Sequence, residues 1–252
     1  MCEFAIIEPW TSFVDVVDYH RYGSAFGSPV ARVQGIGYIQ ELVARLTHTP
    51  IKTHNTSTNA TLNDNPITFP LGQSLYVDAT HEVVVLNSKG FFSSSVSSYL
   101  FEFFFKVITA LNLTTFAESG PLPYTHIPHD RTFRSAELAP FATNIQFQRA
   151  YTTSICSSDK MFSYISTLPS VLECTSLPGP QIRIIINDAV APLTGIRGCH
   201  KHKDGMCSVE TFVAAQKEII RNTDWEYDCY GNWTVPPGTD WETITGDTPK
   251  HK

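Results

Sequence analysis

An adjacent histidine and glutamate, His81 and Glu82, are the residues of this sequence that best suit acid–base chemistry. They follow the apolar run Leu75–Ala79, which has the pattern of a buried strand, and a second apolar run comes after them. Catalytic groups of an open α/β sheet gather where its strands end, so the pair is predicted to lie at an active-site edge. There an imidazole can contact an anion while the neighbouring carboxyl donates a proton. The alternative interpretation is a loop pair whose hydrogen bonds are satisfied locally.

Helices and further strands are predicted around this pair. Segments 8–20 and 35–48 each carry apolar residues at helical spacing. Farther along the chain, Gln181–Asp188 has the pattern of a strand that ends in a turn at Asn187 and Asp188. Ser208 can cap a following helix, whose predicted buried face comprises Val209, Phe212, Val213, Gln216 and Ile220.

The composition is that of a globular domain. A chain of 252 residues with 42% hydrophobic and 17% charged residues can bury a sizeable core. Its formal net charge of -6 gives no sign of the basic surface that nucleic-acid binding needs. Polar and charged residues interrupt its longest apolar stretch well short of the roughly 20 residues of a membrane span. Neither nucleic acid nor a membrane is therefore expected as a partner.

Cysteines and glycosylation sequons favour a secreted protein. The chain has six cysteines and four Asn-x-Ser/Thr sequons, at Asn55, Asn59, Asn112 and Asn232. The first residues, Met1–Phe4, lack the basic start and the following apolar core of a signal peptide. The sequence therefore predicts either a cytosolic protein or one whose beginning is missing from this chain.

Five blocks in a particular order connect the chain to a known family. They are Gln34–Tyr38, Glu41–Pro50, Phe69–Leu71, Leu75–Glu82 and Ile184–Leu193, followed by Cys199 and Cys207. Together they resemble the C-terminal half of the fungal histidine acid phosphatases, the phytase-like branch of the phosphoglycerate-mutase-like superfamily. The resemblance implies an incomplete α/β sandwich of that superfamily over residues 1–231, with helices flanking a mixed sheet. Residues 232–252 are expected to form a loose tail.

The resemblance also implies a chemistry, the two-step hydrolysis of a phosphomonoester such as inositol phosphate without a cofactor. In that family, a histidine in an Arg-His-Gly-x-Arg-x-Pro motif attacks phosphorus, and a later His-Asp pair binds phosphate and protonates the leaving oxygen. His81 and Glu82 match the later pair, so His81 is expected to contact phosphate and Glu82 to be the proton donor. Glutamate stands where the family has aspartate, and a misplacement on the order of 1 Å can cost about a hundredfold in rate.

The attacking histidine of the family has no counterpart in this sequence. No Arg-His-Gly string occurs in the 252 residues, and the nearest string is His20-Arg21-Tyr22-Gly23. The chain alone is therefore expected to be an inactive portion of such an enzyme, extracellular by its family and its sequons. The alternatives are a non-catalytic protein that keeps a phosphate-binding pocket, and an unstable fragment.

A second dipeptide, His129-Asp130, has the same two residue types as the family's His-Asp pair. It follows Pro128 in an expected loop and precedes Arg131, where the family pair would precede an apolar run. We therefore regard it as the weaker candidate for the phosphate contact.

For the cysteines, the resemblance implies one disulfide, between Cys199 and Cys207. Three other cysteines match family positions whose partners lie outside this chain, namely Cys2, Cys174 and Cys229. A zinc site is the alternative interpretation, because His200 and His202 lie between the paired cysteines at a spacing that suits metal ligands. The disulfide would consume both thiols, so no metal is expected.

Two stretches, 88–106 and 149–170, interrupt otherwise continuous helix and strand patterns. Removing them would restore those patterns, which favours retained introns as their origin. The alternative is a pair of real surface insertions, since loop insertions cost little stability.

Overall fold

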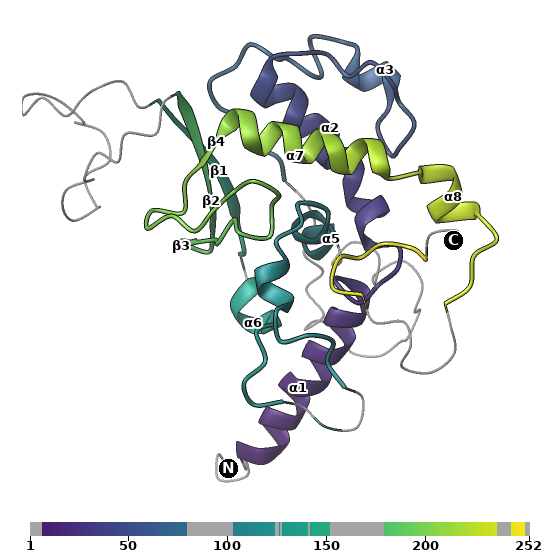
Figure 1. Cartoon of the computed structure of the whole chain (residues 1–252), viewed down its shortest axis with the longest axis vertical. Coiled ribbons are helices and arrows are strands. Elements are labelled where there is room, and N and C mark those ends of the chain that lie inside the picture. The colour runs from purple at the N-terminus through teal and green to yellow at the C-terminus, as the bar shows by residue number, and fades with distance from the viewer. Residues whose placement is uncertain are drawn as a thin grey trace, which may run out of the picture.

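The computed structural model describes residues 7–79, 103–123, 126, 128–140, 142–151, 179–235 and 243–249. Its elements in chain order are α1 (Ile7–Ser24), α2 (Ala31–Thr47), α3 (Ala60–Asn63), α5 (Phe103–Ala110), the 3-10 helix η2 (Thr114–Ala117), α6 (Ser135–Leu138), β1 (Ile145–Tyr151), β2 (Pro180–Ile186), β3 (Ala189–Val190), β4 (Cys207–Ser208), α7 (Val209–Asn222) and α8 (Trp225–Tyr230). Figure 1 shows the small sheet on one side of α2, α5 and α7, while α1 extends away toward the N-terminal end. The α/β class predicted from the sequence is confirmed.

Helix α2 is central to the described core. It packs against α5, α7 and α8, and its Ile36 and Ile39 are completely buried. The helix expected over residues 35–48 is thus confirmed, although it begins earlier, at Ala31. Gly35 lets α2 approach α5 closely, because a Cβ atom at this position would lie 2.3 Å from the carbonyl oxygen of Lys106.

Replacing Gly35 with alanine is expected to lower the free energy of unfolding by about 1–3 kcal/mol, the usual cost of overpacking a core. Gly23→Ala in α1 is the matched control, since a Cβ there would meet nothing within 4 Å. The control should gain about 0.5–1 kcal/mol from helix propensity. Urea unfolding curves of both variants measure the difference, and equal midpoints for the two would show that α2 and α5 are not in close contact in solution.

The sheet is organised around β2. This strand pairs antiparallel with β1, β3 and β4, so every described pair is antiparallel, whereas the resemblance implied a mixed sheet. The turn expected at the end of β2 is confirmed. Asn187 and Asp188 have φ values of 49° and 67°, and two left-handed residues are what a tight hairpin between β2 and β3 requires.

Helix α7 covers one face of this sheet and also packs on α2. The predicted cap is confirmed, because the Ser208 hydroxyl accepts a hydrogen bond from the Thr211 amide at 3.0 Å. The predicted face is confirmed as well. Phe212 and Gln216 are completely buried, and the Gln216 amide donates to the carbonyl oxygen of Leu111 at 3.2 Å.

One edge of each predicted insertion lies in a regular element of the structure, and the insertions themselves stay a prediction. Residues 103–106 belong to α5, and Phe105 is completely buried in the aromatic core 5.7 Å from the ring of Phe133. Residues 149–151 belong to β1, where Arg149 is the register partner of Ile182. These residues were assigned to insertions because the hydrophobic pattern around them is irregular. In the structure, tertiary packing holds them in a helix and a strand. The rest of both stretches lies outside the described residues.

The predicted loose tail is wrong for residues 243–249. The guanidinium of Arg32, a largely buried group, donates to the Thr245 carbonyl at 3.1 Å and lies 2.7 Å from the Asp247 carboxylate. The Arg32 amide also donates to the Gly246 carbonyl at 3.1 Å. Burial lowers the pKa of Arg32 and the charge of Asp247 opposes that shift. A buried cation needs such partners, and the short polar residues of this segment supply them.

A buried ion pair joins α1 to the segment before α6. Asp18 is only 1% exposed, and its carboxylate accepts from Arg131 Nε at 2.9 Å. Its other oxygen accepts from the amide and the hydroxyl of Ser135, at 2.8 and 2.6 Å. Arg131 also contacts Asp15 at 2.8 Å. This network fixes the middle of α1 to the rest of the described core.

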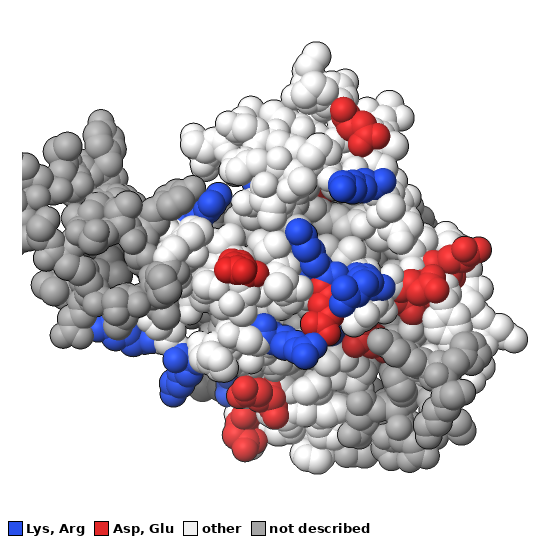
Figure 2. All heavy atoms as spheres, turned by 45° about the horizontal axis from the view of Figure 1, so that its top comes forward, with Lys and Arg blue, Asp and Glu red and all other residues white. Residues whose placement is uncertain are grey.

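Charges of both signs are interspersed on the face of the molecule that Figure 2 shows. Within the described ranges, no helix combines the length and the apolar character that crossing a membrane would require.

Candidate functional site

The predicted catalytic pair, His81 and Glu82, lies outside the described residues, which approach it as far as Ala79. The segment that leads to the pair departs from expectation. Residues 75–79 belong to no helix and no strand, and Leu75 and Val77 are 74% and 83% exposed. The predicted buried strand is therefore wrong in this structure. An apolar run indicates burial only where a partner strand satisfies its backbone groups, and no described strand pairs with this one.

Replacing Leu75 and Val77 with threonine is expected to change the free energy of unfolding by less than about 0.5 kcal/mol, because both side chains already face water. Self-association should decrease, since exposed apolar side chains favour it. Sedimentation velocity and urea unfolding measure the two effects. The same changes at Leu42 and Val43, each 6% exposed in α2, are the controls and should be strongly destabilising. A large loss of stability at 75 and 77 would mean that this segment is buried in solution.

A cation on α2 holds the exposed segment in place. Arg45, in the last turn of α2, donates two hydrogen bonds to the Asp78 carboxylate, of which Nη2 to Oδ1 measures 3.1 Å. The same guanidinium lies between two rings, 5.1 Å from the centroid of Phe69 and 5.1 Å from that of Tyr76. Bidentate pairing and stacking on aromatic faces are the two contacts that favour arginine over lysine. We call Arg45, Phe69, Tyr76 and Asp78 the arginine clamp.

Burial and the charge of Asp78 shift the pKa values of two groups of α2, Arg45 in the clamp and Tyr38 near it. Burial raises the pKa of Tyr38 to about 12, with a further rise from the charge of Asp78, so its hydroxyl stays protonated. Burial lowers the pKa of Arg45, but the hydrogen bond and charge of Asp78 outweigh it and the net shift is upward. The Arg45 side chain is 14% exposed, so its attraction to Asp78 is only partly screened by solvent. Arg45 therefore stays charged as the attachment point for this segment.

The clamp restrains Asp78, which precedes His81 by three residues in the sequence. Sequence reasoning missed this link because Arg45 and Asp78 are 33 residues apart and belong to separate local patterns. The charge pattern at Glu41 and Arg45, one helical turn apart at 3.8 Å, was the only local sign that this end of α2 carries ionic contacts.

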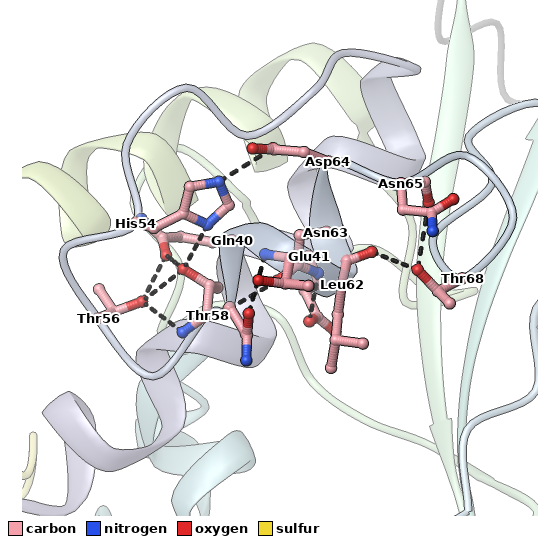
Figure 3. A network of polar contacts seen from close by, with 12 residues as sticks. Gln40, Glu41, His54, Thr56, Thr58, Leu62, Asn63, Asp64, Asn65 and Thr68 are labelled. Carbon is pink, nitrogen blue, oxygen red and sulfur yellow. Dashed lines mark hydrogen bonds and ion pairs between the residues drawn. The ribbon is translucent and has the colours of Figure 1, made fainter.

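Beside the clamp, the loop from Thr49 to Thr68 folds over α2 through a polar network (Figure 3). His54 links two parts of this loop. Its Nε2 lies 3.1 Å from Asp64 Oδ1, and its Nδ1 lies 3.2 Å from the Thr58 hydroxyl. Both nitrogens of the ring therefore have partners, and the ring orientation is fixed.

Two side chains of α2 anchor the same loop (Figure 3). Gln40, which is buried, accepts a hydrogen bond from the Thr56 hydroxyl at 2.6 Å. Glu41 accepts from the Asn63 amide at 2.8 Å, and Asn63 in turn accepts from the Asn59 backbone amide at 2.9 Å. These bonds satisfy polar groups that burial would otherwise leave unpaired, and they hold the loop against the helix.

The weaker candidates fall on other surfaces. His129 and Asp130 are exposed in a turn, where Arg134 donates to the His129 carbonyl at 2.9 Å. Cys199 and Cys207 form the disulfide that the resemblance implied, so their thiols are not available to a metal. No cluster of three or more His, Cys, Asp or Glu side chains suited to a metal ion occurs in the described part of the chain.

The predicted glycosylation sites differ in accessibility. Asn55, Asn59 and Asn232 are exposed. Asn112 is engaged, because its Oδ1 accepts from Arg32 Nη2 at 2.8 Å and its Nδ2 donates to the Gly195 carbonyl. A glycan attaches to this Nδ2, so modification at Asn112 would require the contact with Gly195 to break. We therefore keep only the three exposed asparagines as proposed glycosylation sites.

Comparison with known proteins shows the family to which this chain is related. Residues 7–95 match the histidine phosphatase superfamily, branch 2. The matched range contains the arginine clamp as well as His81 and Glu82. The resemblance predicted from the sequence is thereby confirmed, and the chain is related to the phytase-like histidine acid phosphatases.

Particular relatives are fungal proteins named phytase A. The chain is 30% identical to phytase A of Aspergillus oryzae over 230 residues, which cover 89% of this chain and 39% of the relative. It is 33% identical to phytase A of Aspergillus fumigatus over 210 residues, 82% of this chain and 35% of that protein. Phytase A of Neurospora crassa is 27% identical over 213 residues, with 81% and 37% covered. The chain thus spans less than half the length of these relatives.

Proposed function

We propose that this chain supplies the phosphate-contacting histidine, His81, and the proton donor, Glu82, of a phytase-like histidine acid phosphatase site. We further propose that these 252 residues alone do not hydrolyse phosphomonoesters. The observation that carries the proposal is the matched range 7–95, in which His81 and Glu82 follow the clamped segment. The substrate class is a phosphomonoester such as inositol phosphate, in keeping with the name of the relatives. The setting is extracellular, in keeping with the exposed sequons.

The proposed chemistry assigns each group one step. A nucleophilic histidine nitrogen forms a bond to phosphorus while the ester P–O bond breaks, and its electron pair leaves on the substrate oxygen. Glu82 donates the proton that makes this oxygen a good leaving group. His81 donates a hydrogen bond to a phosphoryl oxygen and offsets its negative charge. Water then attacks the phosphorus atom of the phosphohistidine, and the P–N bond breaks with its electron pair returning to the histidine nitrogen. The Glu82 carboxylate takes a proton from that water, and inorganic phosphate is released.

The absence of an Arg-His-Gly string explains why turnover is not expected from this chain. The first bond-forming step needs the family's motif histidine, and the sequence offers only His20-Arg21-Tyr22-Gly23 as a distant likeness. His20 and Arg21 lie within α1, where Arg21 stacks over the ring of Phe105 at 5.8 Å. Arg21 is thus held by the core instead of being presented to a phosphate.

A non-catalytic phosphate-binding protein is the second candidate function. The retention of His81 and Glu82 without the nucleophile motif favours it, because these groups can contact phosphate without breaking a bond. The two candidates share the same binding step. They differ in whether the chain acts alone or needs a nucleophile supplied from outside these 252 residues.

The test is a turnover assay on a clean preparation of the chain. Inositol hexakisphosphate and p-nitrophenyl phosphate are supplied at acid pH, and released phosphate is measured. We expect no release above the rate of the buffer alone. Phosphate release that purifies with the chain and disappears in Glu82→Gln would overturn the proposal that it is inactive alone, while supporting the role of Glu82.

A further inference from the structure

A cleft of about 410 Å³ lies where the loop after α2 meets the start of α8. Six residues line it, three from the loop and three from α8 and its cap, namely His54, Asn55, Thr56, Asp224, Trp225 and Glu226. None of them belongs to the arginine clamp or to the predicted catalytic pair. The cleft is therefore a separate feature of the surface.

One of the lining residues, Asn55, is a glycosylation acceptor in the sequon Asn55-Thr56-Ser57. Its side chain is exposed, while both of its neighbours in the chain are held. His54 lies 3.1 Å from Asp64, and Thr56 donates to Gln40 at 2.6 Å. The backbone on each side of Asn55 is thus fixed, and a group attached to its Nδ2 would start at the cleft.

The opposite wall has the chemistry that suits a neutral sugar. Trp225 lines the cleft and is partly buried against the core, and the C–H face of a pyranose can pack on an indole ring. Asp224 and Glu226 are exposed carboxylates that can accept hydrogen bonds from hydroxyl and acetamido groups. The same two charges repel phosphate, so the cleft is unsuited to a second anionic substrate.

We propose that an N-linked glycan on Asn55 occupies this cleft, with its first N-acetylglucosamine packed against Trp225. The inference rests on the extracellular setting given under the proposed function. A covalently attached sugar starts near its binding position, so a weak stacking contact suffices to hold it. The glycan then joins the loop to α8 and stabilises this contact between them.

The other sequons lack this arrangement. The Asn59 side chain caps α3 by accepting from the Thr61 amide at 2.9 Å, and Asn59 does not line the cleft. Asn112 is engaged with Arg32 and Gly195. Asn232 is exposed beyond the end of α8. Asn59 therefore serves as the internal control, a second sequon in the same loop without an aromatic wall.

The experiment produces the chain with a secretion leader in a glycosylating host and trims its glycans to a single N-acetylglucosamine. Site occupancy is read by mass spectrometry, and thermal midpoints are compared for parent, Ser57→Ala and Thr61→Ala. Ser57→Ala removes the Asn55 glycan and leaves Asn55 itself in place. Each protein is also made with Trp225→Leu, which keeps an apolar side chain against the core and removes the aromatic ring. Removal of the remaining sugar by an amidase under native conditions is timed in parallel.

We expect Asn55 to be occupied, and its sugar to raise the midpoint by about 2–4 °C in the parent and by less than about 1 °C with Trp225→Leu. The shift in midpoint caused by the sugar at Asn59 should be the same with Trp225 and with Trp225→Leu. Native release of the Asn55 sugar should become at least several-fold faster with Trp225→Leu. An unoccupied Asn55, or a sugar whose midpoint shift and release rate do not depend on residue 225, would overturn the proposal. Neither outcome depends on phosphatase activity, so this test can fail independently of the proposed function.

Discussion

Asp18→Ala is expected to lower the free energy of unfolding by about 3–5 kcal/mol, the usual cost of breaking a buried ion pair. Asp18 is 1% exposed and accepts from Arg131 at 2.9 Å and from Ser135 at 2.8 and 2.6 Å. Without this carboxylate, the buried guanidinium of Arg131 loses one of its two ion-pair partners. The backbone amide and the hydroxyl of Ser135 lose their hydrogen-bond acceptor. Domains are stable by only about 5–15 kcal/mol, so the variant should be close to unfolding at room temperature.

Urea unfolding followed by circular dichroism measures this loss. Asp15→Ala is the matched control, because Asp15 also contacts Arg131 at 2.8 Å but is 28% exposed and should cost no more than about 1 kcal/mol. The double variant Asp18→Leu with Arg131→Met removes both charges and should recover part of the stability. Similar losses for Asp15→Ala and Asp18→Ala would contradict the described network, since they would place the two carboxylates in equivalent surroundings.

Arg45→Met is expected to weaken the binding of inorganic phosphate by about ten- to a hundredfold, the range typical of replacing a residue that supports the ligands of a metal site. Arg45 does not belong to the pair that we propose to contact phosphate. We propose that it positions that pair, because its bonds to Asp78 and its contacts with the rings of Phe69 and Tyr76 hold the segment that precedes His81 in the sequence.

Isothermal titration with phosphate measures this effect, and unfolding curves of the same samples separate it from a general loss of stability. Arg45→Lys keeps the charge but not the bidentate geometry, so it should lie between the parent and Arg45→Met. Arg197→Met is the matched control, since Arg197 is 78% exposed and pairs with Glu218 on the surface. Unchanged phosphate affinity in a folded Arg45→Met protein would show that the clamp does not position the site.

Most of the secondary structure that was predicted correctly follows from local patterns in the sequence. Helix α2 follows from apolar residues at helical spacing, and α7 from the Ser208 cap together with its buried face. The turn at Asn187 and Asp188 follows from residues that tolerate positive φ. Each of these signals lies within a few consecutive residues, so one sequence was enough to recognise it.

The features that sequence reasoning missed are links between distant segments. Asp18 and Arg131 are 113 residues apart, and Arg45 and Asp78 are 33 apart. The C-terminal segment was expected to be loose because threonine, glycine and aspartate are typical of loops. Its order comes from the partners that it offers to the buried Arg32. An ion pair has no periodicity, and composition alone does not report what a loop packs against.

The segment at 75–79 shows the opposite error, a strong local pattern that the fold does not use. The apolar run Leu75–Ala79 predicted a buried strand, yet the side chains of Leu75 and Val77 are exposed. A strand is completed by its neighbours, and the information about neighbours is not local. A single local pattern is equally weak evidence for a family. It was the order of the family blocks along the chain that indicated the class of the protein.

The central claim is that the imidazole at position 81 contacts phosphate in this chain. Its most direct measurement is a phosphate titration of the purified protein by NMR at pH 5, observing the histidine ring protons of the parent and of His81→Ala. We predict one ring signal that shifts with phosphate in a saturable manner and is missing from the spectrum of the variant, which should also lose phosphate binding by calorimetry. A folded parent in which no histidine signal responds to phosphate, or a variant that binds phosphate as well as the parent, would contradict the account.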